Sequence, residues 1–126
     1  MPTETTFIQL PCGARAFRME ARGVLSMEDA RTVIRQLEPG GVLYGLPAVI
    51  LAQHLDSISS DARAALAAHG QARPREHWLA VVMTNPLLRV TANFILRVQR
   101  ATKAKLFPTE PEALQWLDAK VRERQG

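Results

Sequence analysis

Residues 77–121 read HWLAVVMTNPLLRVTANFILRVQRATKAKLFPTEPEALQWLDAKV, and this stretch decides the fold. It begins with an apolar run of strand length, Trp78–Met83, and continues with an amphipathic helix over Leu87–Arg100. A short strand at Ala104–Phe107 and a closing helix over Thr109–Arg124 follow. Because buried strands that alternate with helices pack as a sheet covered by helices, the stretch predicts an α/β fold.

The chain before this stretch predicts three more strands and two more helices. Phe7–Leu10 and Ala14–Val24 flank a Pro-Cys-Gly turn, which indicates an antiparallel pair. A helix capped by Ser26 follows, and then the continuous apolar run Ala48–Ala52, typical of a central parallel strand. Residues 53–60 are predicted to be a polar connection to a helix over Asp61–His69.

The predicted order is β-β-α-β-α-β-α-β-α, in one domain that spans residues 1–126. Crossovers of this length require the later strands to be parallel. We therefore expect a mixed five-stranded sheet with about four helices.

The third helix is predicted to start at Asn85-Pro86, where Asn85 is the N-cap and Pro86 lacks an amide that would be unpaired anyway. Its apolar residues recur at helical spacing, so we expect them to face the sheet. This inward stripe consists of Leu87, Val90, Thr91, Phe94, Ile95 and Val98.

The composition is that of a soluble globular protein, with 47% hydrophobic and 22% charged residues in 126. No apolar run approaches the roughly 20 residues of a membrane span. The first residues lack the pattern of a signal peptide, so a cytoplasmic protein is expected. Cys12 is the single cysteine, which excludes an internal disulfide.

The net charge of +4 is unevenly distributed along the chain. Residues 1–60 carry −1 and residues 61–126 carry +5. Five bases and no acid lie in the segment 89–105, which is either a solvated face or a surface for phosphate, anionic lipid or an acidic partner. Aromatic residues that could stack on bases do not interleave with them, so nucleic acid is not expected as a partner. The five bases are Arg89, Arg97, Arg100, Lys103 and Lys105.

No catalytic, metal or cofactor site is expected from the sequence. Cys12 lies in a turn, and His54, Asp56 and Ser57 are neighbours along one segment that lacks a Gly-x-Ser-x-Gly elbow. The histidines share no spacing typical of metal ligands. The glycine-rich patterns that bind nucleotide phosphates are absent.

Three pieces of sequence resemble one known fold group. They are GVLS at 23–26 before a helix, VIL at 49–51 with ISSDAR at 58–63, and AVVMTNP at 80–86 with KLFPTEPEALQWL at 105–117. Their order and spacing resemble the STAS-like, or SpoIIAA-like, proteins, the group of bacterial anti-sigma factor antagonists. The STAS/SEC14-type branch of small bacterial proteins is the more similar part of it. The resemblance implies a non-enzymatic interaction or regulatory module that docks an unidentified protein partner or forms a homodimer.

The resemblance also draws attention to three serines, Ser57, Ser59 and Ser60. Phosphoregulated members carry a serine in an Asp-Ser-Ser-Gly-like motif at the start of the second helix, where free amides receive a phosphate well. The present segment, DSISSDAR at 56–63, lacks that order of residues. Ser59 or Ser60 is therefore either a phosphorylated switch or simply the N-cap of the helix.

A second hypothesis is a carrier or sensor of a small apolar or anionic lipid-like ligand. STAS/SEC14-type relatives share their general plan with lipid-carrier domains. The basic residues between 89 and 105 would then make weak contact with anionic lipid head groups. The pocket would be lined by Trp78, Phe94, Ile95, Val98 and Trp116.

Overall fold

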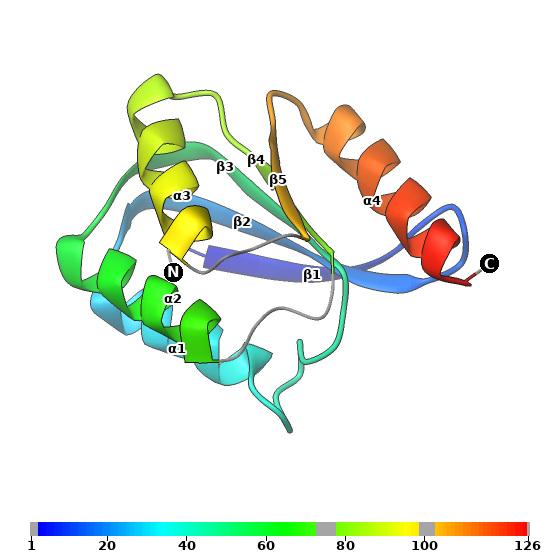
Figure 1. The fold of residues 1–126 in the computed structure, drawn as a ribbon, viewed down its shortest axis with the longest axis horizontal. Helices are drawn as coiled ribbons and strands as arrows, with labels where there is room; N and C mark the ends of the chain where they lie inside the picture. The colour runs from blue at the N-terminus through cyan, green and yellow to red at the C-terminus, as the bar shows by residue number, and fades with distance from the viewer. Residues whose placement is uncertain (1–2, 73–77, 99–102, 126) are drawn as a thin grey trace.

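The computed structural model describes residues 3–72, 78–98 and 103–125. Five strands and four helices occur in the predicted order β-β-α-β-α-β-α-β-α (Figure 1). Their bounds are β1 Thr3–Gln9, β2 Arg15–Leu25, α1 Met27–Leu37, β3 Ala48–Ile58, α2 Ser60–Ala72, β4 Leu79–Val82, α3 Pro86–Val98, β5 Ala104–Phe107 and α4 Glu110–Gln125.

The strands form one mixed sheet in which spatial order equals chain order, β1-β2-β3-β4-β5. β1 is antiparallel to β2, and each later pair is parallel. Helices α1, α2 and α3 cover one face of the sheet and α4 lies on the other (Figure 1). We call these the three-helix side and the α4 side.

Alternation along the central strands supplies both sides with core residues. On β3, Val49 and Leu51 pack toward Ala113 and Leu117 of α4. The residues of β3 that alternate with these two face the three-helix side. There Ala52 packs in a cluster with Leu88 and Ala92 of α3. Because β3 is buried on both faces, the continuous apolar pattern at its start is explained.

Local sequence signals define the helix starts. Ser26 and Asp29 form a reciprocal capping box, since the Ser26 hydroxyl accepts from the Asp29 amide at 3.3 Å and the Asp29 carboxylate accepts from the Ser26 amide at 3.1 Å. At the start of α3, the Asn85 side-chain oxygen accepts from the amide of Leu87 at 2.9 Å. These caps are where the sequence predicts them.

Strand β3 is longer than predicted. The polar residues that follow Ala52 were expected to form a connection, but β3 continues to Ile58. The extension pairs with the end of β2, where register shifts on either side of Arg22 and Gly23 bend the strand. Gly23 has φ +66°, a conformation that other residues rarely adopt, so the bulge depends on this glycine.

Helix α3 lies with a different face toward the sheet from the one predicted. Leu88, Ala92 and Ile95 are buried, whereas three residues of the predicted inward stripe, Leu87, Val90 and Phe94, are exposed. Ile95, also a large residue of that stripe, is buried as predicted. The periodicity is compatible with either face, because apolar residues occur on both sides of this helix. The observed face includes Ala92, which belongs to the same buried cluster as Ala52 of β3.

Candidate ligand site

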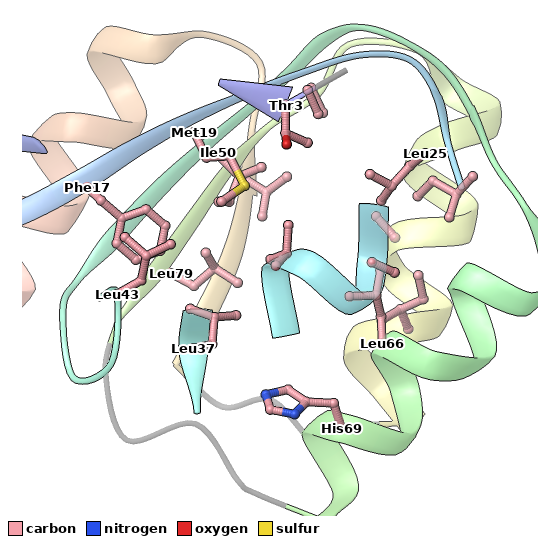
Figure 2. Close-up of a pocket in the computed structure, with 18 of the residues that line it drawn as sticks. Thr3, Phe17, Met19, Leu25, Leu37, Leu43, Ile50, Leu66, His69 and Leu79 are labelled. Carbon is pink, nitrogen blue, oxygen red and sulfur yellow. The ribbon is translucent and has the colours of Figure 1, made fainter. Parts of the chain in front are cut away.

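A cavity of about 480 Å³ lies between the sheet and the three helices α1, α2 and α3 (Figure 2). Its walls are mainly aliphatic, and residues from the sheet and from all three helices contribute to them. Representative lining residues are Met19, Ile50, Val33, Leu66, Ile95 and Leu106. The volume falls within the range of about 300–1,000 Å³ that is common for small-molecule pockets.

Small side chains explain why the space is not filled. Four alanines line the cavity, one each from β2, α1, β3 and α3, namely Ala21, Ala30, Ala52 and Ala92. An alanine that faces another alanine across a core leaves room that larger side chains would occupy. Sequence reasoning missed the cavity because an alanine in an apolar stripe reads as ordinary core.

Few polar side chains border the cavity. Among the described residues, the lining includes Thr3 from β1, Tyr44 from the connection between α1 and β3, and His69 from α2. Figure 2 shows the imidazole of His69 reaching from α2 toward Leu37 at the end of α1. Such groups can hydrogen-bond one polar end of a ligand whose remainder contacts aliphatic walls.

The five residues predicted to line a pocket do not come together. Trp78 and Trp116 pack on the α4 side, with ring centroids 5.6 Å apart in an edge-to-face arrangement. Phe94 is exposed on the outer surface of α3, and Ile95 alone of the five lines the cavity among the residues with described side chains. The side chain of Val98 lies outside the described part of the structure.

The structure also separates the bases of segment 89–105. Arg89 and Arg97 belong to α3 on the three-helix side. Lys103 and Lys105 lie on the α4 side, 5.8 Å and 5.6 Å from the ring centroids of Trp78 and Phe107 respectively. Arg100 is outside the described residues. The predicted single basic face is therefore divided between the two sides of the sheet.

Of the three candidate serines, Ser59 is the N-cap of α2. Its hydroxyl accepts from the Ala62 amide at 3.3 Å and donates to the Asp61 carboxylate at 2.6 Å. That hydroxyl hydrogen bond, helped by the Ala62 amide, lowers the pKa of Asp61. Ser57 lies within β3, and Ser60 is exposed with its hydroxyl 3.4 Å from a guanidinium nitrogen of Arg63. The cap interpretation is confirmed for Ser59, and phosphorylation stays a prediction.

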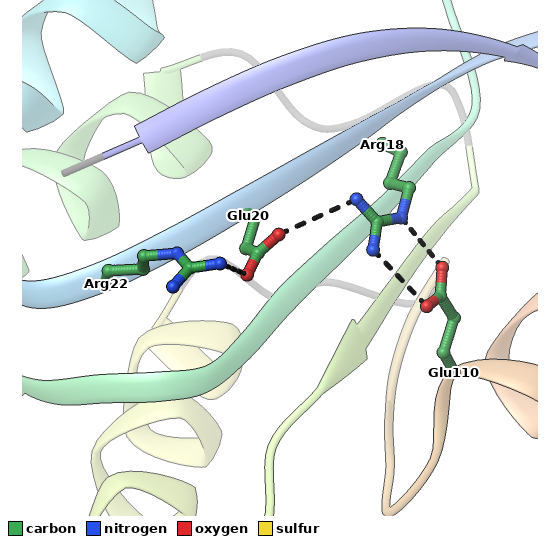
Figure 3. A network of polar contacts seen from close by, with 4 residues as sticks. All are labelled: Arg18, Glu20, Arg22 and Glu110. Atoms are coloured by element: carbon green, nitrogen blue, oxygen red, sulfur yellow. Dashed lines mark hydrogen bonds and ion pairs between the residues drawn. The ribbon is translucent and has the colours of Figure 1, made fainter. Parts of the chain in front are cut away.

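A polar network connects β2 with the start of α4 on the α4 side (Figure 3). Arg18 donates from Nε to Glu110 at 2.8 Å and from Nη2 to the same carboxylate at 3.4 Å. Glu20 lies between Arg18 and Arg22 and pairs with both. The hydrogen bond that Arg18 donates to Glu110 raises the pKa of Arg18 above its ordinary value. This network links two elements rather than forming a pocket of its own.

Residues with catalytic chemistry are dispersed over the molecule. His54 and Asp56 are both exposed on β3, away from the cavity walls. Cys12 lies in the turn between β1 and β2, where its amide donates to Asp118 of α4 at 2.9 Å. Within the part of the chain that the structure describes, no group of three His, Cys, Asp or Glu residues is placed to hold a metal ion.

None of the helices in the described ranges combines the length and the apolar character needed to cross a bilayer.

Comparison with solved structures identifies the fold. An uncharacterised protein of the DUF3478 family from Shewanella loihica PV-4, which has a SpoIIAA-like fold, superposes with a TM-score of 0.70. The match covers 91% of this chain and 93% of the other at 21% sequence identity. The resemblance in the sequence is thereby confirmed at the level of the fold.

Comparison of the sequence itself gives the family. No curated protein matches the chain. A family described as "Domain of unknown function (DUF7793)" matches over residues 15–120, from the start of β2 into α4. The chain therefore belongs to the DUF7793 family, and its fold is SpoIIAA-like.

Proposed function

We propose that the chain is a non-enzymatic binding module that holds a small apolar molecule between its sheet and helices α1, α2 and α3. The cavity of about 480 Å³ carries this proposal. Transfer of apolar surface from water into such a space is favourable by about 25 cal/mol for each Å² that is buried. The ligand would be a carried or sensed molecule rather than a substrate.

The distribution of polar groups supports a ligand with one polar end. Thr3, Tyr44 and His69 border the cavity, and the other side chains that line it are apolar. Gly45 contributes only backbone. A long apolar molecule that ends in a hydroxyl, carbonyl or carboxylate would satisfy both kinds of wall. A uniformly polar metabolite would bury hydrogen-bond donors and acceptors without partners against the aliphatic residues.

The same lining supports a role without catalysis. Acyl transfer or hydrolysis requires a nucleophile, a base and a group that orients the base. The described lining residues include one imidazole, that of His69, and no carboxylate or cysteine. His54 and Asp56, the remaining acid–base candidates, are exposed elsewhere.

The proposal can be tested with Nile red, an uncharged fluorophore that emits more strongly in apolar surroundings. The wild-type protein should bind it with saturation, and Ala92→Phe should weaken binding about tenfold or more, because the new ring occupies the cavity. Ala64→Phe is the matched control, since Ala64 is exposed on α2. Circular dichroism should report a folded protein in each case. Equal affinity of the wild type and Ala92→Phe would rule out the cavity as the binding site.

A second candidate is an interaction module that uses the free edge of β1. This strand is at the end of the sheet order, and residues 4–7 are exposed. Such an edge can pair with another strand, either from a second copy or from a regulatory partner. A homodimer of this kind should dissociate on Thr5→Lys, as measured by light scattering after gel filtration. A wild-type protein that is monomeric at every concentration would exclude the homodimer.

A further inference from the structure

Helix α3 presents a row of large apolar side chains to solvent. Leu87 is 80% exposed, Val90 69% and Phe94 59%. Residues three and four positions apart lie on the same side of a helix, so these three form a continuous surface that we call the outer stripe. Isolated exposed apolar residues are common, but three large ones in a row on one helix call for an explanation.

The opposite side of α3 is also apolar. Ala92, Ile95 and Leu96 line the cavity, and Leu88 packs in the core. A helix that is apolar on both sides is usually covered on both sides. In the ranges that the structure describes, the inner side of α3 has the sheet as its partner and the outer stripe has none.

The charges around the outer stripe are positive. Helix α3 itself carries two arginines, Arg89 and Arg97, and its sequence from Pro86 to Val98 contains no carboxylate. Arg97 is exposed and follows Phe94 by three positions and Val90 by seven, so it lies along the stripe. Arg89 is partly buried on a flank of the same helix. The covering partner should therefore be apolar and flanked by negative charge.

An anionic lipid bilayer has these properties. An amphipathic helix can lie in the plane of the interface with its apolar residues at the boundary between head groups and acyl chains, while arginines meet the phosphates. A second copy of the chain fits less well. A two-fold axis would place the same surface against itself and bring the basic flank of one protomer close to that of the other.

We propose that α3 docks this protein on anionic membranes through Leu87, Val90 and Phe94, with Arg97 contacting lipid phosphate. The helix that lies on the bilayer is then the one that forms a wall of the cavity. Docking does not require that the cavity hold a ligand, so a failure of ligand binding would not disprove membrane docking.

The experiment is flotation of the purified chain with vesicles of equal parts phosphatidylglycerol and phosphatidylcholine. The wild type should float with these vesicles, should remain largely unbound with pure phosphatidylcholine, and should be released at high salt. Phe94→Ser should weaken binding about tenfold, because a large apolar side chain no longer enters the interface. Arg97→Gln should weaken it about fivefold and reduce the salt dependence.

Val90→Ser and Val42→Ser form a matched pair of variants. Val42 is 67% exposed in the connection between α1 and β3, close to the 69% of Val90, so the two substitutions remove the same group from equally exposed sites. Val90→Ser should weaken vesicle binding several-fold, and Val42→Ser should leave it unchanged. Thermal unfolding should report that both variants remain folded.

Two results would overturn the proposal. One is the absence of membrane-specific binding: either the folded wild type does not float with the anionic vesicles, or the Phe94→Ser and Arg97→Gln variants float as well as the wild type. The other is a wild-type dimer that becomes monomeric on Phe94→Ser and does not bind vesicles, which would assign the outer stripe to a second copy of the chain.

Discussion

Arg18 is the residue that connects the second strand with the last helix. Its guanidinium makes two hydrogen bonds to Glu110, and both side chains are about one-third exposed. A double-mutant cycle with Arg18→Ala and Glu110→Ala should give a coupling free energy of about 0.5–1 kcal/mol, as expected for a partly solvated pair. Arg18→Lys should lose part of this coupling, since lysine cannot present two parallel donors. Additive effects in urea unfolding would mean that the pair contributes nothing to stability.

Ser59 should stabilise the start of α2 as an N-cap. We expect Ser59→Ala to lower the free energy of unfolding by about 0.5–1 kcal/mol, the lower part of the range for caps. The loss is moderate because Asp61 also accepts from the Ala62 amide, at 2.9 Å. Ser60→Ala is the control and should change the stability by less than about 0.5 kcal/mol. Equal effects of the two substitutions in urea unfolding would contradict the assignment of Ser59 as the cap.

Asp118 should make the stability depend on pH in the acidic range. The amide of Cys12 lowers the pKa of Asp118 below its ordinary value of 3.8, and Arg122 adds to the effect. Because the folded pKa is depressed, the contribution is complete above about pH 5 and is lost as the pH falls through the folded pKa. Wild type and Asp118→Asn should therefore differ in urea stability at neutral pH and converge in acid. A difference that stays constant with pH would disprove this role.

At the scale of elements, two buried alanines on different helices should respond in opposite ways to enlargement. Ala92 of α3 borders the cavity, whereas Ala113 of α4 is fully buried against the packed α4 side. Ala92→Leu should leave the melting temperature unchanged or raise it, because the added methyl groups fill free space. Ala113→Leu should destabilise the protein by about 1–3 kcal/mol through overpacking. Comparable destabilisation by both variants, measured by thermal unfolding, would mean that the space beside Ala92 is not available.

The elements themselves could be predicted from short-range signals. Caps such as Ser26 and Asn85 and the apolar runs of β3 and β4 act locally, so the sequence contains the information. The end of β3 could not be predicted in this way, since its polar residues are held in the sheet by pairing with the bulged end of β2. The face that α3 turns toward the sheet could not be predicted either, because apolar residues lie on both sides of this helix.

At the scale of the molecule, the two sides of the sheet differ in packing. The α4 side is covered by one helix with a continuous buried cluster, and the cavity lies on the three-helix side. Sequence periodicity predicts which residues are apolar but not whether their volumes fill the space between layers. For this reason the sequence predicts one pocket that contains Trp78, Trp116 and Ile95, although the sheet separates the two tryptophans from Ile95. The described bases of segment 89–105 are likewise near one another in the chain but lie on different sides of the sheet.

A ligand in the cavity should stabilise the whole fold. At a Nile red concentration one hundred times its Kd, the free energy of unfolding should rise by about 2.7 kcal/mol. The increase should appear in the wild type and in Ala64→Phe, and it should be smaller in Ala92→Phe at the same dye concentration. Thermal unfolding monitored by circular dichroism would measure it. An equal increase in all three proteins would indicate that the dye binds outside the cavity.

The order of the strands in the sheet also has a consequence during synthesis. Because spatial order equals chain order, each strand that leaves the ribosome can add directly to the edge formed by the preceding one. Helix α4 follows all five strands in the chain, and it covers Val49, Leu51, Ala80 and Val82. An intermediate in which the strands have paired before residues 110–125 dock therefore exposes one apolar face of the sheet, and at this stage the chain depends most on chaperones.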